Sequence, residues 1–262
     1  MVTRDTPWPA GYPCWVDLMT NDLEAAKEFY TGLFGWNLTD TGSEGGGYLM
    51  ADVDGKSVAG LGGQQPGQEG HPSVWTTYLA SDDVDATCEK VTAAGGIVFA
   101  PPFDVMDVGR MAIVQDLTGA TLGVWQAKAH IGAQLANDPG SFTWNELMTR
   151  DYDRAKSFYG EVFGYTFSEL GDENFSYCTL DVDGRPVGGL GTLPDEVPKE
   201  VPAHWRVYFA VEDADKSLSR AAELGGAILR PAEDMPYGRW GDAADGQGAM
   251  FSLMKPAPAP EG

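Results

Sequence analysis

Hydrophobic and polar residues first alternate along the chain and then take up a helical spacing. Between Trp15 and Thr20 the alternation has a period of two, which predicts a strand with two distinct faces. Asn21 and Asp22 follow, and apolar residues then recur every three or four positions as far as Gly35. Because Asp favours the start of a helix and Gly the position after its end, this stretch is predicted to be an amphipathic helix.

Short strands complete this first unit. Residues 48–53 and 57–61 are predicted strands, joined by a hairpin turn at residues 54–55 (DG). A second unit of the same plan follows, with a strand at 74–80, a helix at 84–94, and strands near 97–99, 110–115 and 121–126. Each unit therefore has the predicted order βαβββ.

The second half of the chain repeats the first. Residues 14–22 (CWVDLMTND) match 143–151 (TWNELMTRD), and residues 26–30 (AKEFY) match 155–159 (AKSFY). The matches continue in order: 34–36 with 163–165, 52–55 with 181–184, 60–62 with 189–191, 95–96 with 225–226 (one residue out of phase), and 109–110 with 238–239. So many ordered matches indicate a tandem duplication.

The repeat sets the predicted fold class and domain organisation. We expect an α+β protein with four βαβββ units in two modules, each a curved mixed sheet with its helices on the convex face. The predicted boundaries are 1–128 for the first module, 129–141 for a linker, 142–256 for the second module and 257–262 for a disordered tail.

The amino-acid composition limits which classes of molecule the protein is expected to bind. With 39 acidic against 17 basic residues the formal charge is −22, which opposes binding to nucleic acid and to anionic membranes. We find no apolar run of membrane-spanning length and no apolar signal core at the start, so we expect a cytoplasmic protein. The three cysteines are widely spaced and predict neither a disulfide framework nor a CxxC site.

These motifs resemble those of the vicinal oxygen chelate superfamily, which includes glyoxalase I, extradiol dioxygenases and bleomycin-resistance proteins. The resemblance lies in the strand, the capping Asp and the Phe-Tyr helix, and in residues 116–120 (DLTGA) and 245–249 (DGQGA), which are similar to the family's turn before its last strand. The opening W-x-D/E-L-M-T is similar to a tandem actinobacterial group described as glyoxalase-like or as hydroxylases of antibiotic pathways. The resemblance implies the fold strongly and the function weakly, because the fold hosts unrelated chemistries.

Enzymes of this superfamily usually hold one metal ion through His or Glu on the concave sheet face. The resemblance places those ligand positions on residues that are not normal metal ligands. They are Trp15, Trp75 and Gly123 in the first module and Trp144, Trp205 and Ser252 in the second. The chain has only three histidines, and His204 is expected to point away from the pocket. We therefore predict no bound metal and no cofactor.

The period of two along each strand predicts which residues face the concave side. Asp17 and Glu146 are the candidate catalytic residues, because burial between Trp and Met would raise the pKa of a carboxyl group. The alternative is a structural hydrogen bond, with Arg110 and Arg239 neutralising these carboxylates. The candidate ligand-binding residues are Trp15, Met19, Tyr48, Trp75, Trp125, Trp144, Met148, Tyr177, Trp205 and Phe209. Trp8, Trp36 and Trp240 fall outside this set.

Four functions remain open from the sequence. The first is metal-independent binding of a small, flat, largely apolar metabolite, aromatic or antibiotic-like, by sequestration or as an accessory protein of secondary metabolism. The second is an enzyme of the glyoxalase-like or hydroxylase-like class that uses Asp17 or Glu146 as general acid or base. A metal-dependent lyase or dioxygenase is disfavoured by the missing ligands. The fourth is a structural protein whose concave faces are closed by the other copy. Two cavities in one chain allow a monomer, or a weak homodimer.

Overall fold

A computed structural model describes every residue except 1, 43–45, 65–66, 68–69, 173–174 and 258–262. Two eight-stranded mixed sheets dominate the fold, one in each module, which confirms the α+β prediction. The predicted tail lies mostly outside the described residues, which end at Ala257. None of the helices in the described part is both long enough and apolar enough to cross a membrane.

The sheet of the first module joins its two units edge to edge. Its strands lie in the order β3 (Asn37–Asp40), β4 (Leu49–Val53), β5 (Lys56–Gly63), β2 (Pro13–Thr20), β6 (Val74–Ala80), β9 (Thr121–Ala127), β8 (Gly109–Gln115) and β7 (Ile97–Val105). Helices α1 (Leu23–Phe34) and α2 (Val84–Ala93) are the crossovers that make β2 parallel to β5 and β6 parallel to β9.

The second module repeats this topology. Its strand order is β12 (Thr166–Glu169), β13 (Tyr177–Val182), β14 (Arg185–Thr192), β11 (Phe142–Thr149), β15 (His204–Ala210), β18 (Met250–Pro256), β17 (Gly238–Ala244) and β16 (Ala227–Met235). Its helices are α3 (Tyr152–Phe163) and α4 (Ala214–Glu223).

Local sequence explains where the first helix begins and ends. The Asp22 carboxylate accepts a hydrogen bond from the backbone N–H of Ala25 at 3.0 Å, as an N-cap should. Gly35 ends the helix in the left-handed conformation, with φ of +71°. Between them Ala26, Phe29 and Tyr30 are buried, so the predicted stripe is the face that packs.

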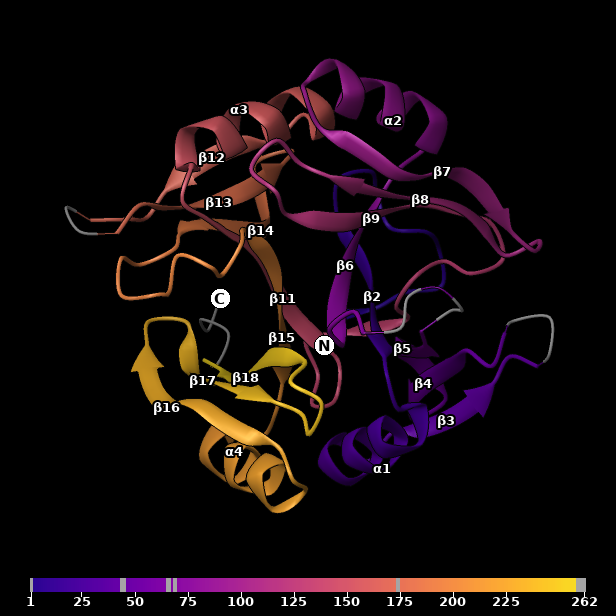
Figure 1. The fold of residues 1–262 in the computed structure, drawn as a ribbon, viewed down its shortest axis with the longest axis vertical. Coiled ribbons are helices and arrows are strands. Elements are labelled where there is room, and N and C mark those ends of the chain that lie inside the picture. Colours follow the sequence, from indigo (N-terminus) through magenta and orange to yellow (C-terminus); the bar gives the residue numbers. More distant parts are fainter. Residues whose placement is uncertain (1, 43–45, 65–66, 68–69, 173–174, 258–262) are drawn as a thin grey trace.

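The two modules do not have separate hydrophobic cores. One core combines α1 and its strands with residues of α4, β15 and β18, and includes Phe209 and Phe251 of the second module. The other combines α2, β8 and β9 with α3, β13 and β14. Figure 1 shows the consequence: α2 and α3 lie together at the top, and α1 and α4 at the bottom. Each half of one module is therefore stabilised by a half of the other.

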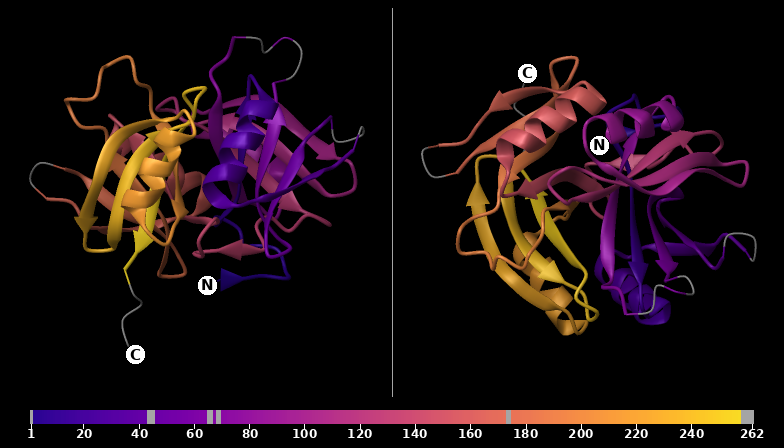
Figure 2. Two further views of the ribbon diagram at one scale, coloured as in Figure 1. Left: turned by 90° about the horizontal axis from the view of Figure 1, so that it is seen from below. Right: turned by 45° about the horizontal axis from the view of Figure 1, so that its top comes forward.

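The curved sheets meet in the middle of the molecule and open to opposite sides (Figure 2). At the meeting point the Thr77 hydroxyl donates to the Asn145 side-chain oxygen at 2.8 Å. A short two-stranded ribbon, formed by β1 (Val2–Thr3) and β10 (Leu135–Ala136), is a separate sheet that packs against β5. The concave faces, which lie opposite the helices, are thus on separate sides of the molecule.

Candidate functional site

A buried carboxyl group occupies the concave face of the first module. Asp17 lies in the middle of β2 and is 5% exposed. Its Oδ2 accepts hydrogen bonds from the hydroxyls of Tyr78, at 3.0 Å, and Tyr48, at 3.2 Å. Tyr48 in turn accepts the indole N–H of Trp15 at 2.9 Å. These four side chains form one hydrogen-bonded cluster drawn from two strands, β2 and β6, and the loop before β4.

The second module builds the same cluster. Glu146 is 6% exposed and accepts the Tyr208 hydroxyl at 2.6 Å and the Tyr177 hydroxyl at 3.0 Å. The Trp144 indole N–H donates to Tyr177 at 3.0 Å. Because the arrangement occurs twice, we treat it as a built feature of this fold and call it the Trp–Tyr–carboxyl cluster.

Glycines in the neighbouring strand make room for the tyrosine rings. A Cβ at Gly60 would lie 1.8 Å from the Tyr48 hydroxyl oxygen, and one at Gly189 would lie 2.1 Å from that of Tyr177. A Cβ at Gly123 would lie 2.0 Å from the Tyr78 ring. The glycines in the repeated residues 60–62 and 189–191 are therefore explained by close packing rather than by a turn.

Burial sets the protonation of both carboxyls. Desolvation raises the pKa of Asp17 to about 7, although the hydrogen bonds from Tyr78 and Tyr48 oppose the shift. Its other oxygen, Oδ1, is buried and has no hydrogen-bond partner among the described residues. Desolvation also raises the pKa of Glu146, and here the charge of Arg206 and the two tyrosine hydroxyls counteract it. With a pKa of about 7, Asp17 can hold or release a proton near neutral pH.

The fifth strand of each module faces the opposite way from the prediction. Trp75, expected on the concave face, is the cross-strand partner of Leu18 and donates its indole N–H to Tyr30 of α1 at 3.0 Å. Trp205 likewise pairs with Leu147 and donates to Tyr159 of α3 at 2.9 Å. Both tryptophans therefore belong to the helix side of the sheet.

Phe209 is also a core residue and not a pocket residue. Its ring packs against those of Phe34 and Trp36 of the first module, at centroid distances of 4.9 and 5.8 Å. The physical reason for all three corrections is register. Cross-strand partners share a face, so pairing Trp75 with Leu18 instead of with a concave-facing residue turns the whole strand over.

Because the fifth strands present the opposite face from the one predicted, Tyr78 lies on the concave face of the first module. His204, Arg206 and Tyr208 lie on the concave face of the second module. The sequence interpretation missed both tyrosines, and its expectation that His204 points away is wrong, because His204 pairs with Met148. One feature of the sequence could have predicted Tyr78 and Tyr208 as residues of the site. They occupy matching places in the repeat, immediately after Thr77 and Val207.

The remaining face residues follow the prediction with one addition. Met19 and Met148 lie beside the tyrosine rings, since a Cβ at Gly62 or Gly191 would come within 3.2 Å of their sulfur atoms. Trp240, which the sequence interpretation left out, is the cross-strand partner of Met254 and lies 5.6 Å from the Tyr208 ring. The second module therefore carries two tryptophans on its concave face, Trp144 and Trp240.

A histidine from the linker occupies the aromatic face of the first module. The His130 ring meets Trp15 edge-on at 4.4 Å and lies 5.3 Å from Trp125. The His130 carbonyl accepts the Trp125 indole N–H at 3.0 Å, and its backbone N–H donates to Val108. Burial lowers the pKa of His130 to about 4, so the ring is neutral at pH 7.

Among the residues that the structure describes, the second module has no counterpart of this ring. The corresponding segment after β18, residues 257–262 (APAPEG), contains no aromatic residue. Trp144 is half-buried, whereas Trp15 is 4% exposed. The two modules thus share the cluster but differ in what lies against its tryptophan.

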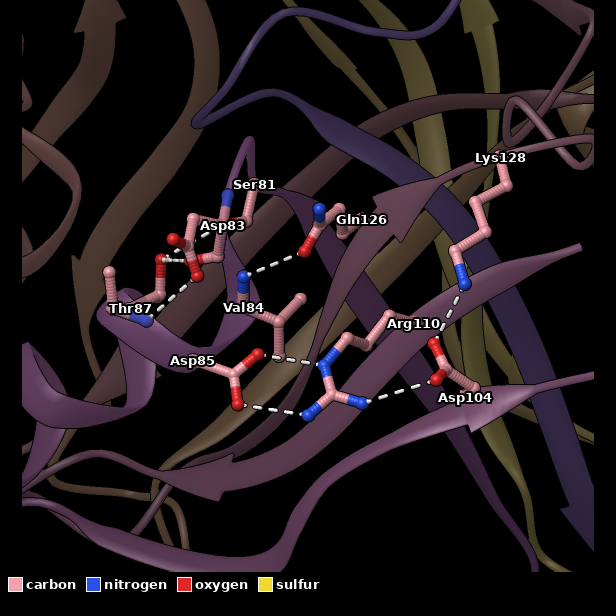
Figure 3. Close-up of polar contacts among 10 residues, drawn as sticks. Ser81, Asp83, Val84, Asp85, Thr87, Asp104, Arg110, Gln126 and Lys128 are labelled. Carbon is pink, nitrogen blue, oxygen red and sulfur yellow. Dashed lines mark hydrogen bonds and ion pairs between the residues drawn. The ribbon is translucent and has the colours of Figure 1, made fainter. Parts of the chain in front are cut away.

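The arginines expected to neutralise the carboxylates do not do so. Arg110 makes two hydrogen bonds with Asp85, at 2.7 and 2.9 Å, and lies 3.6 Å from Asp104, which also binds Lys128 (Figure 3). Arg239 pairs in the same way with Asp215. Both arginines tie a helix to the outer strands, and the cation beside Glu146 is instead Arg206, at 3.9 Å.

The side chains present do not fit a divalent metal ion. Among the residues that the structure describes, no three His, Cys, Asp or Glu side chains converge as a metal site requires. Each buried carboxyl is surrounded by tyrosine hydroxyls, and Glu146 also faces a cation. We therefore derive no chemistry through a metal.

Comparisons with known proteins agree with the architecture. A family model described as the Glyoxalase/Bleomycin resistance protein/Dioxygenase superfamily matches residues 14–124 and 140–253. Among solved structures, a Mn(II)-bound glyoxalase from Novosphingobium aromaticivorans superposes with a TM-score of 0.66 at 15% identity, over 94% of this chain and 83% of that one. That similarity concerns the fold alone.

Two relatives are similar over almost their whole length. "Putative glyoxylase CFP32" of Mycobacterium tuberculosis (strain CDC 1551 / Oshkosh) is 47% identical over 253 residues, covering 95% of this chain and 96% of the relative. "Anthracycline biosynthesis protein DnrV" of Streptomyces peucetius is 39% identical over 267 residues, covering 97% and 95%.

Proposed function

Because the chain belongs to the Glyoxalase/Bleomycin resistance protein/Dioxygenase superfamily, we propose that it binds a small planar organic molecule, without a metal, against Trp144 on the concave face of the second module. The observation that carries the proposal is the difference between the modules. In the first module an imidazole from the chain itself lies against Trp15; in the second, Trp144 is half-buried, and among the described residues no ring packs against it as His130 packs against Trp15.

Three features support a planar, largely apolar ligand. Trp144, Trp240 and Tyr208 provide aromatic surface, and such surfaces favour flat rings. Glu146 and its tyrosines provide a polar group that can orient the ligand. The relatives from Streptomyces are named for anthracycline biosynthesis, which makes a fused-ring metabolite a reasonable ligand class.

Calorimetric titration with a neutral planar probe, 2-naphthamide, tests the proposal. We expect one binding site per chain, and ~10-fold weaker binding in Trp144→Ala because stacking area is lost. Trp15→Phe is the matched control in the first module and should leave the affinity unchanged. Absence of heat with 2-naphthamide and with a soluble anthraquinone would contradict the proposal, as would equal affinity in Trp144→Ala.

A second candidate function is proton transfer on the bound ligand. It is favoured by the position of Glu146, a buried carboxyl with a raised pKa on the same face as Trp144. In this reaction Glu146 would take a proton from an acidic carbon of the ligand and return one to it, so that no other reactant is consumed.

Hydrogen–deuterium exchange at the acidic carbon of 2-tetralone in D2O, followed by NMR, tests this second function. We expect the wild-type protein to accelerate exchange and Glu146→Gln to lose the acceleration while still binding 2-naphthamide. Asp17→Asn, in the module that holds His130, is the control and should retain it. Equal exchange rates with and without protein would leave ligand binding as the only function supported.

A further inference from the structure

Arg206 brings a partly buried positive charge to the concave face of the second module. It lies on β15 as the cross-strand partner of Glu146, and its side chain is 16% exposed. Asp242 faces it from β17, with 3.6 Å between the charged atoms. A guanidinium removed from water in this way is costly unless its donors are used.

Arg206 contacts its two neighbouring carboxylates only at long distances. Its nearest distances, 3.6 Å to Asp242 and 3.9 Å to Glu146, are longer than the 2.7–2.9 Å of a charge-assisted hydrogen bond. By contrast, Arg239 binds Asp215 at 2.6 and 2.9 Å. A guanidinium has five N–H donors, which is more than these long contacts and the neighbouring Tyr208 hydroxyl satisfy.

Other groups already satisfy the carboxylates beside Arg206. Asp242 accepts the Ser252 hydroxyl at 2.6 Å and lies 3.3 Å from a second guanidinium, that of Arg230. The oxygens of Glu146 accept the two tyrosine hydroxyls. Arg230 also pairs with Glu233 at 3.0 Å, so of these two arginines it is Arg206 that has only long contacts to carboxylates.

Apart from Asp17, the counterpart of Glu146, the first module has none of these groups at the matching positions. By the repeat, Thr76 stands in the place of Arg206, Ile113 in the place of Asp242 and Gly123 in the place of Ser252. The arginine is thus confined to the module in which we propose that the ligand binds. Packing of the shared fold does not require it, since the first module builds the same Trp–Tyr–carboxyl cluster without it.

We propose that Arg206 selects ligands whose planar ring carries an anionic oxygen, such as a carboxylate or an ionised phenol or enol. This inference rests on the proposed function, because it assigns the chemistry of the same ligand. Arg is suited to the task, since its planar N–H donors match two oxygens at once. The overall charge of −22 does not oppose it at short range, because salt screens distant charges beyond about 10 Å at 0.1 M ionic strength.

Two probes of nearly the same shape test the selection: 2-naphthoate, which is anionic, and 2-naphthamide, which is neutral. In calorimetric titrations of the whole protein we expect the anion to bind ~10-fold more tightly than the amide. Arg206→Gln should reduce this ratio to about one, and Arg206→Lys, which keeps the charge but loses the planar donors, should leave an intermediate ratio. Arg239→Met, on the helix side of the sheet, is the control and should keep the wild-type ratio.

The outcomes separate this inference from the proposed function. Equal binding of the two probes to the wild-type protein overturns the selection by Arg206 and leaves planar-ligand binding intact. Binding of neither probe contradicts the proposed function itself. A preference for the anion that persists in Arg206→Gln also overturns the inference, and if that variant does not fold, an unchanged ratio in Arg206→Lys does the same.

Discussion

The Tyr30 hydroxyl donates a hydrogen bond to the Asp245 carboxylate at 3.0 Å, and so joins the first helix of the chain to the turn before its last strand. Tyr30 also accepts the Trp75 indole N–H. The second module mirrors this contact with Tyr159 and Asp116, again at 3.0 Å. The two modules therefore hold each other together through buried polar contacts as well as through shared hydrophobic cores.

Removing either tyrosine hydroxyl should destabilise the whole protein. Tyr30→Phe leaves the indole N–H of Trp75 and one oxygen of Asp245 buried without this partner, so we expect a loss of ~1–3 kcal/mol in the free energy of unfolding. Urea unfolding followed by circular dichroism measures it. Tyr237→Phe is the control, since Tyr237 is 60% exposed and its loss should cost almost nothing.

The same experiment tests whether the modules unfold together. Because each hydrophobic core contains residues of both modules, wild type and Tyr30→Phe should each show a single transition. Two separate transitions, one for each module, would contradict the shared-core interpretation.

Removal of the linker ring should open a second ligand site. In His130→Ala the face of Trp15 and Trp125 loses the imidazole against it, so we expect calorimetry with 2-naphthamide to give two sites per chain instead of one. Free imidazole at millimolar concentration should compete for the new site and leave the site at Trp144 unaffected. His71→Ala, which removes an exposed ring, should keep one site. A single site in His130→Ala would show that His130 does not block the first module.

His130 should also make the protein sensitive to acid. Its pKa is lowered to about 4 in the folded protein, so between pH 6.5 and 4 the unfolded chain binds a proton that the folded chain does not. Stability is therefore lost as the pH falls, by up to ~3 kcal/mol at pH 4. His130→Phe keeps a ring in place and should lack this contribution. Between pH 7 and 4, the free energy of unfolding of His130→Phe should rise relative to that of the wild-type protein. A constant difference between the two proteins would refute the lowered pKa of His130.

Asp17 should have the opposite pH dependence. Its pKa is raised to about 7, so between pH 4 and 7 the folded protein binds a proton that the unfolded chain has released. The stability contributed by the protonated form is thus lost as the pH rises, by up to ~4 kcal/mol above pH 8. Asp17→Asn cannot ionise, so it should equal wild type near pH 4 and be more stable at pH 9. Equal stability of the two proteins at pH 9 would show that burial does not disfavour the ionised form of Asp17.

The sequence by itself determined the tandem repeat, the βαβββ order of each unit and the caps of the first helix. These features depend on local chemistry, such as Asp22 binding a backbone N–H of its own helix, or on matches visible in the chain. Alternation also puts Asp17 on the same side of its strand as Trp15, and Glu146 on the same side as Trp144, but it was the family resemblance that identified this side as the concave one.

Only the tertiary structure decided which face the fifth strands present. A period of two fixes that Trp75 and Thr76 point to opposite sides, but the side each takes depends on the partner strand, where Leu18 lies opposite Trp75. Long-range packing also decided the contacts of His130 and Phe209, which lie far along the chain from the rings they meet. Residue spacing carries no information on such contacts, because they form only when distant units fold against one another.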